Sequence, residues 1–240
     1  MRRTLAAAVI LLGLATTPAA AQSRYIFGYT HRDDLAPVTA VQLITDHGVF
    51  NSYVRGWFDD TGRHIQKNDN YVAGILDNQW YRNFFVFDLS AAMAQFGSAS
   101  LRILNPHVAL PWCAPAAFCD GFTSPNPTES YFLRYLNPQY YGAVSADATG
   151  RTDIFSELGS AQVFSHRSVR NADNGQWVDL ALNRKGLADL NERRGNTWGV
   201  GGNLDELRSP VGVVTPEPAT IVLLGTGLVL ILLMGSRRRS

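Results

Sequence analysis

The chain has 240 residues and a formal net charge of +1, and 46% of its residues are hydrophobic. Five arginines lie near the two ends; without them and Glu217, 16 cations and 19 anions remain, so the middle of the chain carries a net charge of −3. Because surfaces that follow nucleic-acid phosphates need clustered Lys and Arg, we expect no nucleic-acid partner. The length fits one domain with a single core.

Residues 1–21 have the pattern of a secretory signal peptide. Two arginines precede a short apolar stretch at residues 5–14, and small residues with the spacing that signal peptidase requires follow it. An N-terminal anchor helix is the alternative, but the stretch is too short to cross about 30 Å of hydrocarbon. We therefore expect an exported protein. The cleavage site is defined by Ala19, Ala21 and Gln22. The mature chain is expected to start at Gln22.

The middle of the chain has the pattern of an all-β domain. Short apolar and aromatic runs alternate with Gly, Pro, Asn and Asp, and helical periodicity is seldom sustained. Nine strands are predicted, a number that suggests a two-sheet β-sandwich. The predicted strands are residues 41–45, 49–57, 71–76, 83–89, 100–104, 131–136, 162–169, 176–182 and 197–204.

Two of these strands differ in how their apolar residues are arranged. The run NFFVFDL at residues 83–89 is apolar on both faces, which predicts a central strand covered on both sides. The run QWVDLAL at 176–182 is apolar on one face only. Asn174 and Gly175 precede it and predict a tight hairpin turn with positive φ after the strand at 162–169.

One short helix is predicted late in the domain. Asn183 can cap its N-terminus, Leu187 and Leu190 can face the core, and Gly195 can end it. Gly186 in its interior lowers the helix propensity.

The two cysteines, Cys113 and Cys119, lie six residues apart. In an oxidising compartment this spacing favours a disulfide that closes a small loop. A zinc site is the alternative, and it would need two further ligands. The five histidines show no paired spacing, although His107 lies near the cysteines and keeps this alternative open.

Residues 219–236 form an apolar segment without a charge. At about 1.5 Å per residue a helix of this length reaches about 27 Å, enough for a thin bilayer, so we expect a single C-terminal transmembrane helix. A buried core helix is the alternative, which the arginines that follow disfavour. Because cationic flanks stay in the cytoplasm, these arginines orient the preceding domain outward.

The segment around this helix resembles the C-terminal sorting signal of PEP-CTERM proteins, the bacterial substrates of exosortases. The resemblance lies in the order of a Pro-Glu-Pro step, an apolar helix and an arginine cluster. Thr215 departs from it, because the family usually has a hydrophobic residue there. Proline keeps the step extended, where a membrane protease can engage it. The residues of the signal are Pro216, Glu217, Pro218, Arg237, Arg238 and Arg239.

This resemblance implies an exosortase as processing partner and localisation in two stages. The helix first anchors an exported precursor in the inner membrane, and the processed protein then reaches the cell surface or the extracellular exopolysaccharide matrix. The expected division is a signal peptide (1–21), a secreted β-sandwich domain (22–208), a short linker (209–215) and a PEP-CTERM sorting signal (216–240) with its helix at 219–236.

A second resemblance covers residues 41–204. Residues 81–106 are similar to a segment shared by one PEP-CTERM subfamily and, more distantly, to DNRLRE-type jelly-roll domains of secreted and cell-wall proteins. Residues 172–202 match the closing portion of the subfamily. The resemblance implies a jelly-roll sandwich and surface display rather than a reaction, although relatives usually carry another strand after Leu204. The matching residues are Phe87, Asp88, Leu89, Ser98, Ala99, Leu101 and Arg102.

The sequence offers little support for an enzyme, and we expect no catalytic residues. Nucleophile elbows, paired histidines on a helix and glycine-rich phosphate loops are all absent from the sequence. Paired carboxylates for glycoside hydrolysis are the weakest alternative, since acidic doublets in polar loops are usually solvated turns. The candidate acids are Asp33, Asp34, Asp59 and Asp60. Asp88, at a strand end, is expected to accept backbone amides or to pair with a cation such as Arg102.

We also expect no cofactor and no metal site. The loops at residues 58–64 and 66–71 are rich in oxygen ligands, so Ca²⁺ remains an alternative, but their spacing matches no EF-hand.

These observations favour a non-enzymatic exported protein with a structural or adhesive role. The alternative is a carbohydrate-binding module of the matrix, because exposed aromatic rings can stack on sugar faces. The candidate rings for such a platform are Trp57, Trp80, Trp112 and Trp177.

Overall fold

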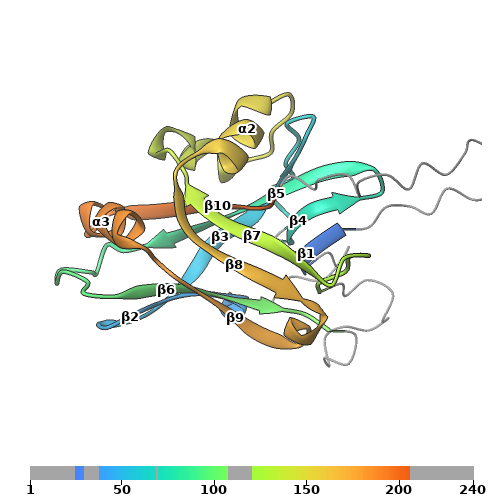
Figure 1. The fold of residues 1–240 in the computed structure, drawn as a ribbon. Helices are drawn as coiled ribbons and strands as arrows, with labels where there is room; N and C mark the ends of the chain where they lie inside the picture. The colour runs from blue at the N-terminus through green and yellow to red at the C-terminus, as the bar shows by residue number, and fades with distance from the viewer. Residues whose placement is uncertain (1–24, 30–37, 69, 108–120, 206–240) are drawn as a thin grey trace, which may run out of the picture. The chain divides into compact units, whose positions relative to one another are not determined.

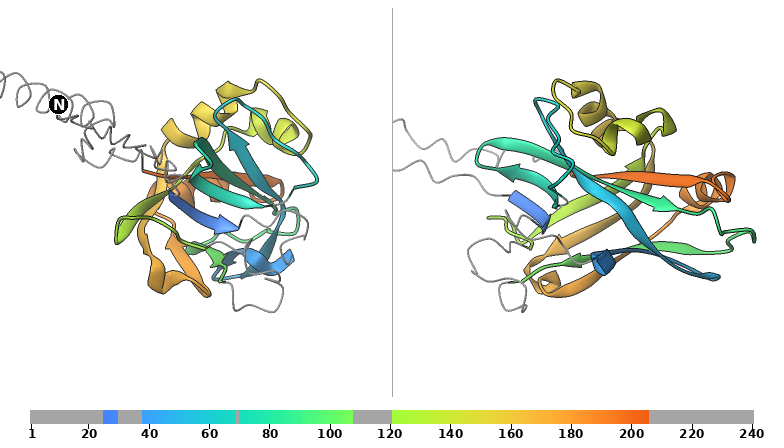
Figure 2. Two further views of the ribbon diagram at one scale, coloured as in Figure 1. Left: turned by 90° about the vertical axis from the view of Figure 1, so that its right-hand side faces the viewer. Right: turned by 180° about the vertical axis from the view of Figure 1, so that it is seen from behind.

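The computed structural model describes residues 25–29, 38–68, 70–107 and 121–205 (Figure 1). The described strands form one antiparallel sheet of ten strands that is nearly closed into a barrel (Figures 1 and 2). Eight strands follow each other in the order β8-β7-β10-β5-β3-β2-β6-β9, and β4 and β1 branch from β5.

The strands are β1 (Tyr25–Tyr29), β2 (Val41–Thr45), β3 (Gly48–Asp59), β4 (Tyr71–Leu76), β5 (Gln79–Asp88), β6 (Ala99–Asn105), β7 (Thr128–Tyr135), β8 (Val163–Arg170), β9 (Gln176–Ala181) and β10 (Thr197–Leu204). The helices are α1 (Tyr141–Val144), α2 (Thr152–Ser160) and α3 (Arg184–Glu192), with 3₁₀ turns η1 (Val38–Ala40), η3 (Pro138–Tyr140) and η4 (Asn171–Asp173).

Each of the nine predicted strands is present, and the predicted bounds of β2, β4 and β10 are those of the structure. The all-β prediction is therefore confirmed at the level of an antiparallel, β-rich fold. Strand β1 was not predicted; its five residues are all buried, and it pairs with β4. A strand buried on both faces lacks the polar alternation that marked the other strands.

The helix after β9 is confirmed. The Asn183 side chain accepts hydrogen bonds from the backbone amides of Lys185 and Gly186, and Leu190 is buried. The expectation of one helix was wrong, because α2 also forms and buries Ile154 and Leu158, four residues apart on one face.

The predicted hairpin at Asn174 and Gly175 is wrong in its pairing. Gly175 has the expected positive φ of 76°, but Asn174 has φ −66° and β8 and β9 do not pair with each other. They pair with β7 and β6 and so lie at opposite ends of the strand order. Asp77 and Asn78, with φ of 53° and 64°, form the tight turn with two positive φ angles, between β4 and β5.

Strand β5 is covered on both sides, as the sequence predicted. Phe85 and Phe87 face the main core inside the sheet, whereas Phe84 and Val86 face a second cluster that includes residues of α2. All four side chains have 0% exposure. Helix α2 lies over the sheet on this second side (Figure 1).

Strand β3 connects two parts of the sheet. Its first part pairs with β2 up to Asn51, and from Ser52 on it pairs with β5, with an irregularity between Ser52 and Val54. Residues of β2, β6 and β9 face residues of β5, β7 and β10 across the main core. In Figure 2 the layer that contains β2 lies on the side of the domain away from α2.

Candidate functional site

Several predicted site residues lie outside the described part of the chain, so those predictions stay predictions. They are the cleavage residues Ala19, Ala21 and Gln22, the cysteines Cys113 and Cys119, the sorting residues Pro216, Glu217, Pro218, Arg237, Arg238 and Arg239, and Asp33, Asp34 and Trp112. Within the described ranges, no helix has the length and hydropathy of a membrane span.

The acidic doublet at the end of β3 stabilises the loop that follows the strand. Asp59 is 1% exposed, and its Oδ1 accepts hydrogen bonds from the Thr61 amide at 3.0 Å, the Thr61 hydroxyl at 2.6 Å and the Arg63 amide at 2.9 Å. Asp60 is exposed. Three donors thus occupy one carboxylate oxygen, which matches the turn interpretation of the doublet. In the described part of the chain, no three His, Cys, Asp or Glu residues are grouped to hold a metal.

Asp88 accepts a backbone amide, one of the two roles that the sequence predicted. Its Oδ1 accepts a hydrogen bond from the Ser90 amide at 2.8 Å. Hydrogen bonds from the Ser90 amide and hydroxyl lower the pKa of this exposed carboxyl. Arg102, the alternative partner, pairs with Asp179 instead.

The candidate tryptophans differ in exposure. Trp57 is 7% exposed and packs against Tyr81, with ring centroids 5.1 Å apart. Trp80 is half-buried. Trp177 on β9 is 38% exposed. The structure therefore does not bring these rings onto one platform of exposed tryptophans, and Trp177 is the described candidate that is open to solvent.

The outer face of β3, β2, β6 and β9 carries a line of polar side chains across four strands. We call Asn51, Gln42, Arg102 and Asp179 the polar row; Gln42 is opposite both Asn51 and Arg102, and Arg102 is opposite Asp179. Their alternation with buried residues places them on the outer side of the sheet. The inward-facing neighbours are Val41, Leu43, Leu101, Ile103, Val178 and Leu180.

Hydrogen bonds join the polar row in two pairs. Gln42 donates from Nε2 to Asn51 Oδ1 at 3.0 Å. Arg102 donates from Nε to Asp179 Oδ1 at 2.7 Å and from Nη2 to Asp179 Oδ2 at 3.4 Å. The side chains of Arg102 and Asp179 are 38% and 47% exposed, so the pair lies at the surface.

Two exposed aromatic residues lie on β9 and β3, the strands at the two ends of the polar row. Trp177 lies two residues before Asp179 on β9, and Tyr53, 57% exposed, lies two residues after Asn51 on β3. Tyr53 stands at the irregularity of β3 between Ser52 and Val54, just after the residues that pair with β2. The Arg102 Cζ atom lies 6.0 Å from the Trp177 ring centroid. Only the exposure distinguishes these rings from core aromatics, and sequence alone does not show it.

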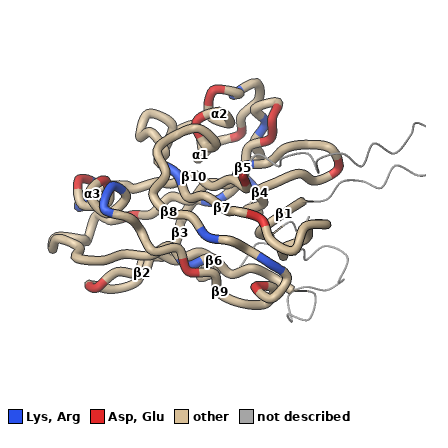
Figure 3. The backbone as a smooth tube through the Cα atoms, in the orientation of Figure 1, with Lys and Arg blue, Asp and Glu red and all other residues tan. Residues whose placement is uncertain are grey.

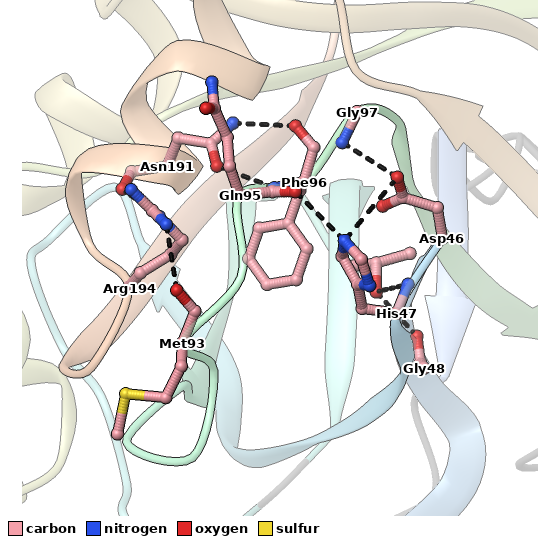
Figure 4. A network of polar contacts seen from close by, with 10 residues as sticks. Asp46, His47, Gly48, Met93, Gln95, Phe96, Gly97, Asn191 and Arg194 are labelled. Carbon is pink, nitrogen blue, oxygen red and sulfur yellow. Dashed lines mark hydrogen bonds and ion pairs between the residues drawn. The ribbon is translucent and has the colours of Figure 1, made fainter.

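A second group of polar contacts joins the β2–β3 turn to the segment after β5 (Figure 4). Asp46 Oδ2 accepts a hydrogen bond from the Gly97 amide at 2.9 Å, which lowers the pKa of Asp46. His47 Nε2 lies 3.0 Å from the carbonyl oxygen of Gln95, to which an Nε2–H group donates. No sequence pattern had indicated this contact of His47.

Asn191 on helix α3 and Arg194 just after the helix hold the same segment from its other side (Figure 4). Asn191 accepts a hydrogen bond from the Phe96 amide at 2.9 Å and donates to the Phe96 carbonyl at 3.0 Å. Arg194 donates from Nη1 to the Met93 carbonyl at 3.0 Å. Since these polar side chains bind backbone groups of one segment, the group in Figure 4 anchors a loop, and we assign it no chemistry.

His64 is buried among aromatic rings of β3 and β5. It is 2% exposed, and its ring centroid lies 5.1 Å from those of Phe58 and Phe84. Nδ1 lies 3.0 Å from the Trp57 carbonyl oxygen, whereas Nε2 is buried without a hydrogen-bond partner. Burial lowers the pKa of His64 from its ordinary value of 6.5.

Beside this histidine lies an open pocket of about 280 Å³ between two loops. An isolated bridge between His64 and Ala148 joins the loops, and Asp147 Oδ1 accepts the Gln66 amide at 2.7 Å. The pocket therefore lies where two loops are connected to each other by hydrogen bonds. Its lining residues are Arg63, His64, Ile65, Asp147, Ala148 and Thr149.

Charges of both signs are interspersed along the described chain rather than gathered into a basic stripe (Figure 3). The outer face with the polar row is the candidate site that combines exposed rings with hydrogen-bonded polar groups.

No family model, no curated protein and no solved structure matches the chain.

Proposed function

We propose that the chain is an exported, non-enzymatic protein that an exosortase sorts to the cell surface or exopolysaccharide matrix, where it has a structural or adhesive role. The observation that carries this proposal is the order of three sequence elements: Pro216-Glu217-Pro218, the apolar segment 219–236 and the arginines 237–239. Each element alone is common, but their order and spacing together match a sorting signal.

Each element has a separate task in this proposal. Signal peptidase removes residues 1–21, and the helix at 219–236 then holds the precursor in the inner membrane. The arginines keep one end of that helix in the cytoplasm. The prolines keep the Pro-Glu-Pro step extended at the outer surface, where the exosortase cleaves near it.

The β domain supports a display role. Its ten antiparallel strands enclose a large aromatic and aliphatic core, which suits a folded unit outside the cell. We propose further that the domain is a jelly-roll sandwich: β3 continues from the layer of β2, β6 and β9 into that of β5, β10 and β7. The likeness of residues 81–106 to jelly-roll domains is consistent with this proposal.

The experiment compares epitope-tagged full-length protein in cells with and without an exosortase. Fractions of inner membrane, cell surface and medium are immunoblotted. We expect a shortened surface species that depends on the exosortase, and a longer membrane species without it. Protein that keeps its length in the membrane of exosortase-positive cells would contradict sorting and leave simple anchoring.

A carbohydrate-binding module is the second candidate. The observation that favours it is Trp177, 38% exposed on β9, with the guanidinium of Arg102 near its ring. Binding to a matrix polysaccharide would retain the processed protein outside the cell without a membrane anchor.

A further inference from the structure

We propose that the outer face of β3, β2, β6 and β9 is a binding site for an uncharged polysaccharide, with Trp177 as its main contact and the polar row as its hydrogen-bonding strip. This inference deepens the second candidate function and rests on it, but it is independent of exosortase processing.

The register of the sheet supplies a continuous strip of hydrogen-bonding groups. Residues of the polar row are opposite each other on consecutive strands, from Asn51 on β3 to Asp179 on β9. Three strand spacings of about 4.8 Å make the strip roughly 14 Å long, enough to lie along an extended polymer. Its amide, guanidinium and carboxylate groups offer both donors and acceptors, which sugar hydroxyls need because each hydroxyl is both.

The side chains of the strip are hydrogen-bonded to one another in the absence of a ligand. Gln42 is hydrogen-bonded to Asn51, and Arg102 makes two hydrogen bonds to Asp179. These bonds use only some of the donors and acceptors on each side chain, so outward-facing ones remain for a ligand. Groups that are already held in place lose less conformational entropy on binding.

Trp177 and Tyr53 add apolar surface beside the strip. The face of a sugar ring that carries C–H bonds packs on a flat aromatic ring, whose polar edge tolerates water. Trp177 is held near Arg102, with 6.0 Å between the Arg102 Cζ atom and the ring centroid. Trp177 is next to the strip on β9, whereas Tyr53 stands at the irregularity of β3 between Ser52 and Val54, so Trp177 is the ring that a ligand along the strip contacts first.

The charge of the face selects an uncharged ligand. Arg102 and Asp179 neutralise each other, and Gln42 and Asn51 are uncharged. A polyanion would meet Asp179 and gain no unpaired cation in the row, whereas a neutral polymer matches the face. A second protein copy fits less well. The row and rings cover roughly 14 Å by 7 Å, much less than the approximately 800 Å² per partner of a stable protein interface.

Affinity gel electrophoresis of the detergent-solubilised full-length chain tests the proposal. Native gels contain hydroxyethylcellulose or dextran as neutral probes, or alginate as an acidic probe. We expect at least one neutral probe to slow the migration of the protein. Alginate should cause no retardation that the neutral probes do not also cause. Trp177→Ala should weaken the interaction about tenfold or more, as for a central aromatic contact, and Trp177→Phe should recover part of it.

Two further variants locate the site. Gln42→Ala should weaken retardation, because it removes one member of the polar row and a partner of Asn51. Met93→Ala is the matched control, because Met93 is 79% exposed and lies in the segment after β5, away from the polar row, where its carbonyl accepts a hydrogen bond from Arg194. It should migrate as wild type does, and circular dichroism checks that every variant folds.

Three outcomes would overturn the proposal: no retardation by either neutral polymer, retardation by alginate alone, or equal retardation of wild type and folded Trp177→Ala. None of them bears on sorting, since the fractionation experiment measures size and location rather than sugar binding. A chain that is sorted but does not bind the neutral probes would keep the proposed function and remove this site.

Discussion

Arg82 on β5 donates a hydrogen bond from Nη1 to the carbonyl oxygen of Phe155 on α2 at 2.7 Å, and its guanidinium carbon lies 4.1 Å from the Phe155 ring centroid. The same side chain lies against Gly159, where a Cβ atom would meet it. Arg134 on β7 donates to the Ala161 carbonyl at 2.8 Å. Two arginines of the sheet therefore bind backbone carbonyls along and just after α2.

Replacing Arg82 with Ala should lower the free energy of unfolding by about 1.5–3 kcal/mol, the usual range for a charged hydrogen bond, because the Phe155 carbonyl loses its donor. Urea denaturation monitored by fluorescence measures this. Arg151→Ala is the matched control, since Arg151 makes an exposed ion pair with Asp153, and such pairs contribute little. Equal effects of both variants would contradict the role given to Arg82.

Stability should fall when the pH drops below about 6.5, and His64 should be one cause. Its folded-state pKa lies below its ordinary value because burial disfavours the charged ring. The unfolded chain therefore takes up the proton first, so the stabilising contribution is present above the unfolded-state pKa and is lost as the pH falls toward the folded-state pKa.

The measurement is the midpoint of urea unfolding at about pH 7.5, 6.5 and 5.5, a range that spans the unfolded-state pKa of histidine. His64→Asn keeps a short donor for the Trp57 carbonyl, which His64 Nδ1 approaches at 3.0 Å, and removes the titrating ring. We expect this variant to be less stable at the highest pH but to have a shallower pH dependence. An unchanged slope would exclude His64 as the titrating group.

Asn174 should be important for stability although it does not form the predicted hairpin. Its Oδ1 accepts hydrogen bonds from Asn105 Nδ2 at 2.8 Å and from the Phe122 amide at 2.5 Å, and its Nδ2 donates to the Phe122 carbonyl at 3.0 Å. Asn174→Ala leaves these groups unpaired and should cost about 1–3 kcal/mol. Thermal and urea unfolding measure the loss. The exposed Asn171→Ala is the control, and a loss of similar size there would argue against this network.

Glu217→Ala tests the sorting proposal within the signal itself. If an exosortase reads the Pro-Glu-Pro step, this variant should accumulate as an uncut species in the membrane, because the helix and arginines that anchor it are intact. Immunoblots of membrane and surface fractions show the difference. Thr215→Ala, next to the step, should be processed normally. A plain single-pass anchor would tolerate the Glu217 change without any shift in size or location.

Sequence patterns predicted strands well and helices less well, for physical reasons. Strands β2, β4 and β10 are bounded by turn residues, and β5 has apolar residues on both faces, so their positions could be predicted. Helix α2 was not predicted from the sequence because its N-cap residue, Arg151, makes no side-chain capping hydrogen bond. It forms because two apolar side chains fit the outer side of the sheet and arginines of the sheet bind carbonyls near its end, which are tertiary effects.

The candidate binding face could not be predicted from the sequence. Trp177 and Trp57 lie in similar apolar runs, yet Trp177 is 38% exposed and Trp57 is 7% exposed, because exposure depends on which elements cover each face. Pairing Gln42 with both Asn51 and Arg102 requires the strand order β3-β2-β6, in which β6 is distant in sequence. The alternative prediction that Arg102 pairs with Asp88 was wrong for the same reason, since Asp179 on β9 is the residue opposite Arg102.

The position of β10 constrains how the domain can be completed during synthesis. This strand, Thr197–Leu204, is the last strand of the described residues, yet it inserts between β5 and β7 and pairs with both. Until it emerges, β5 and β7 each present a free edge, and the aromatic residues beneath them have no cover from Trp198 and Val200. The nascent domain is therefore prone to aggregation until nearly its whole length is available, and a chaperone that shields strand edges would assist its folding.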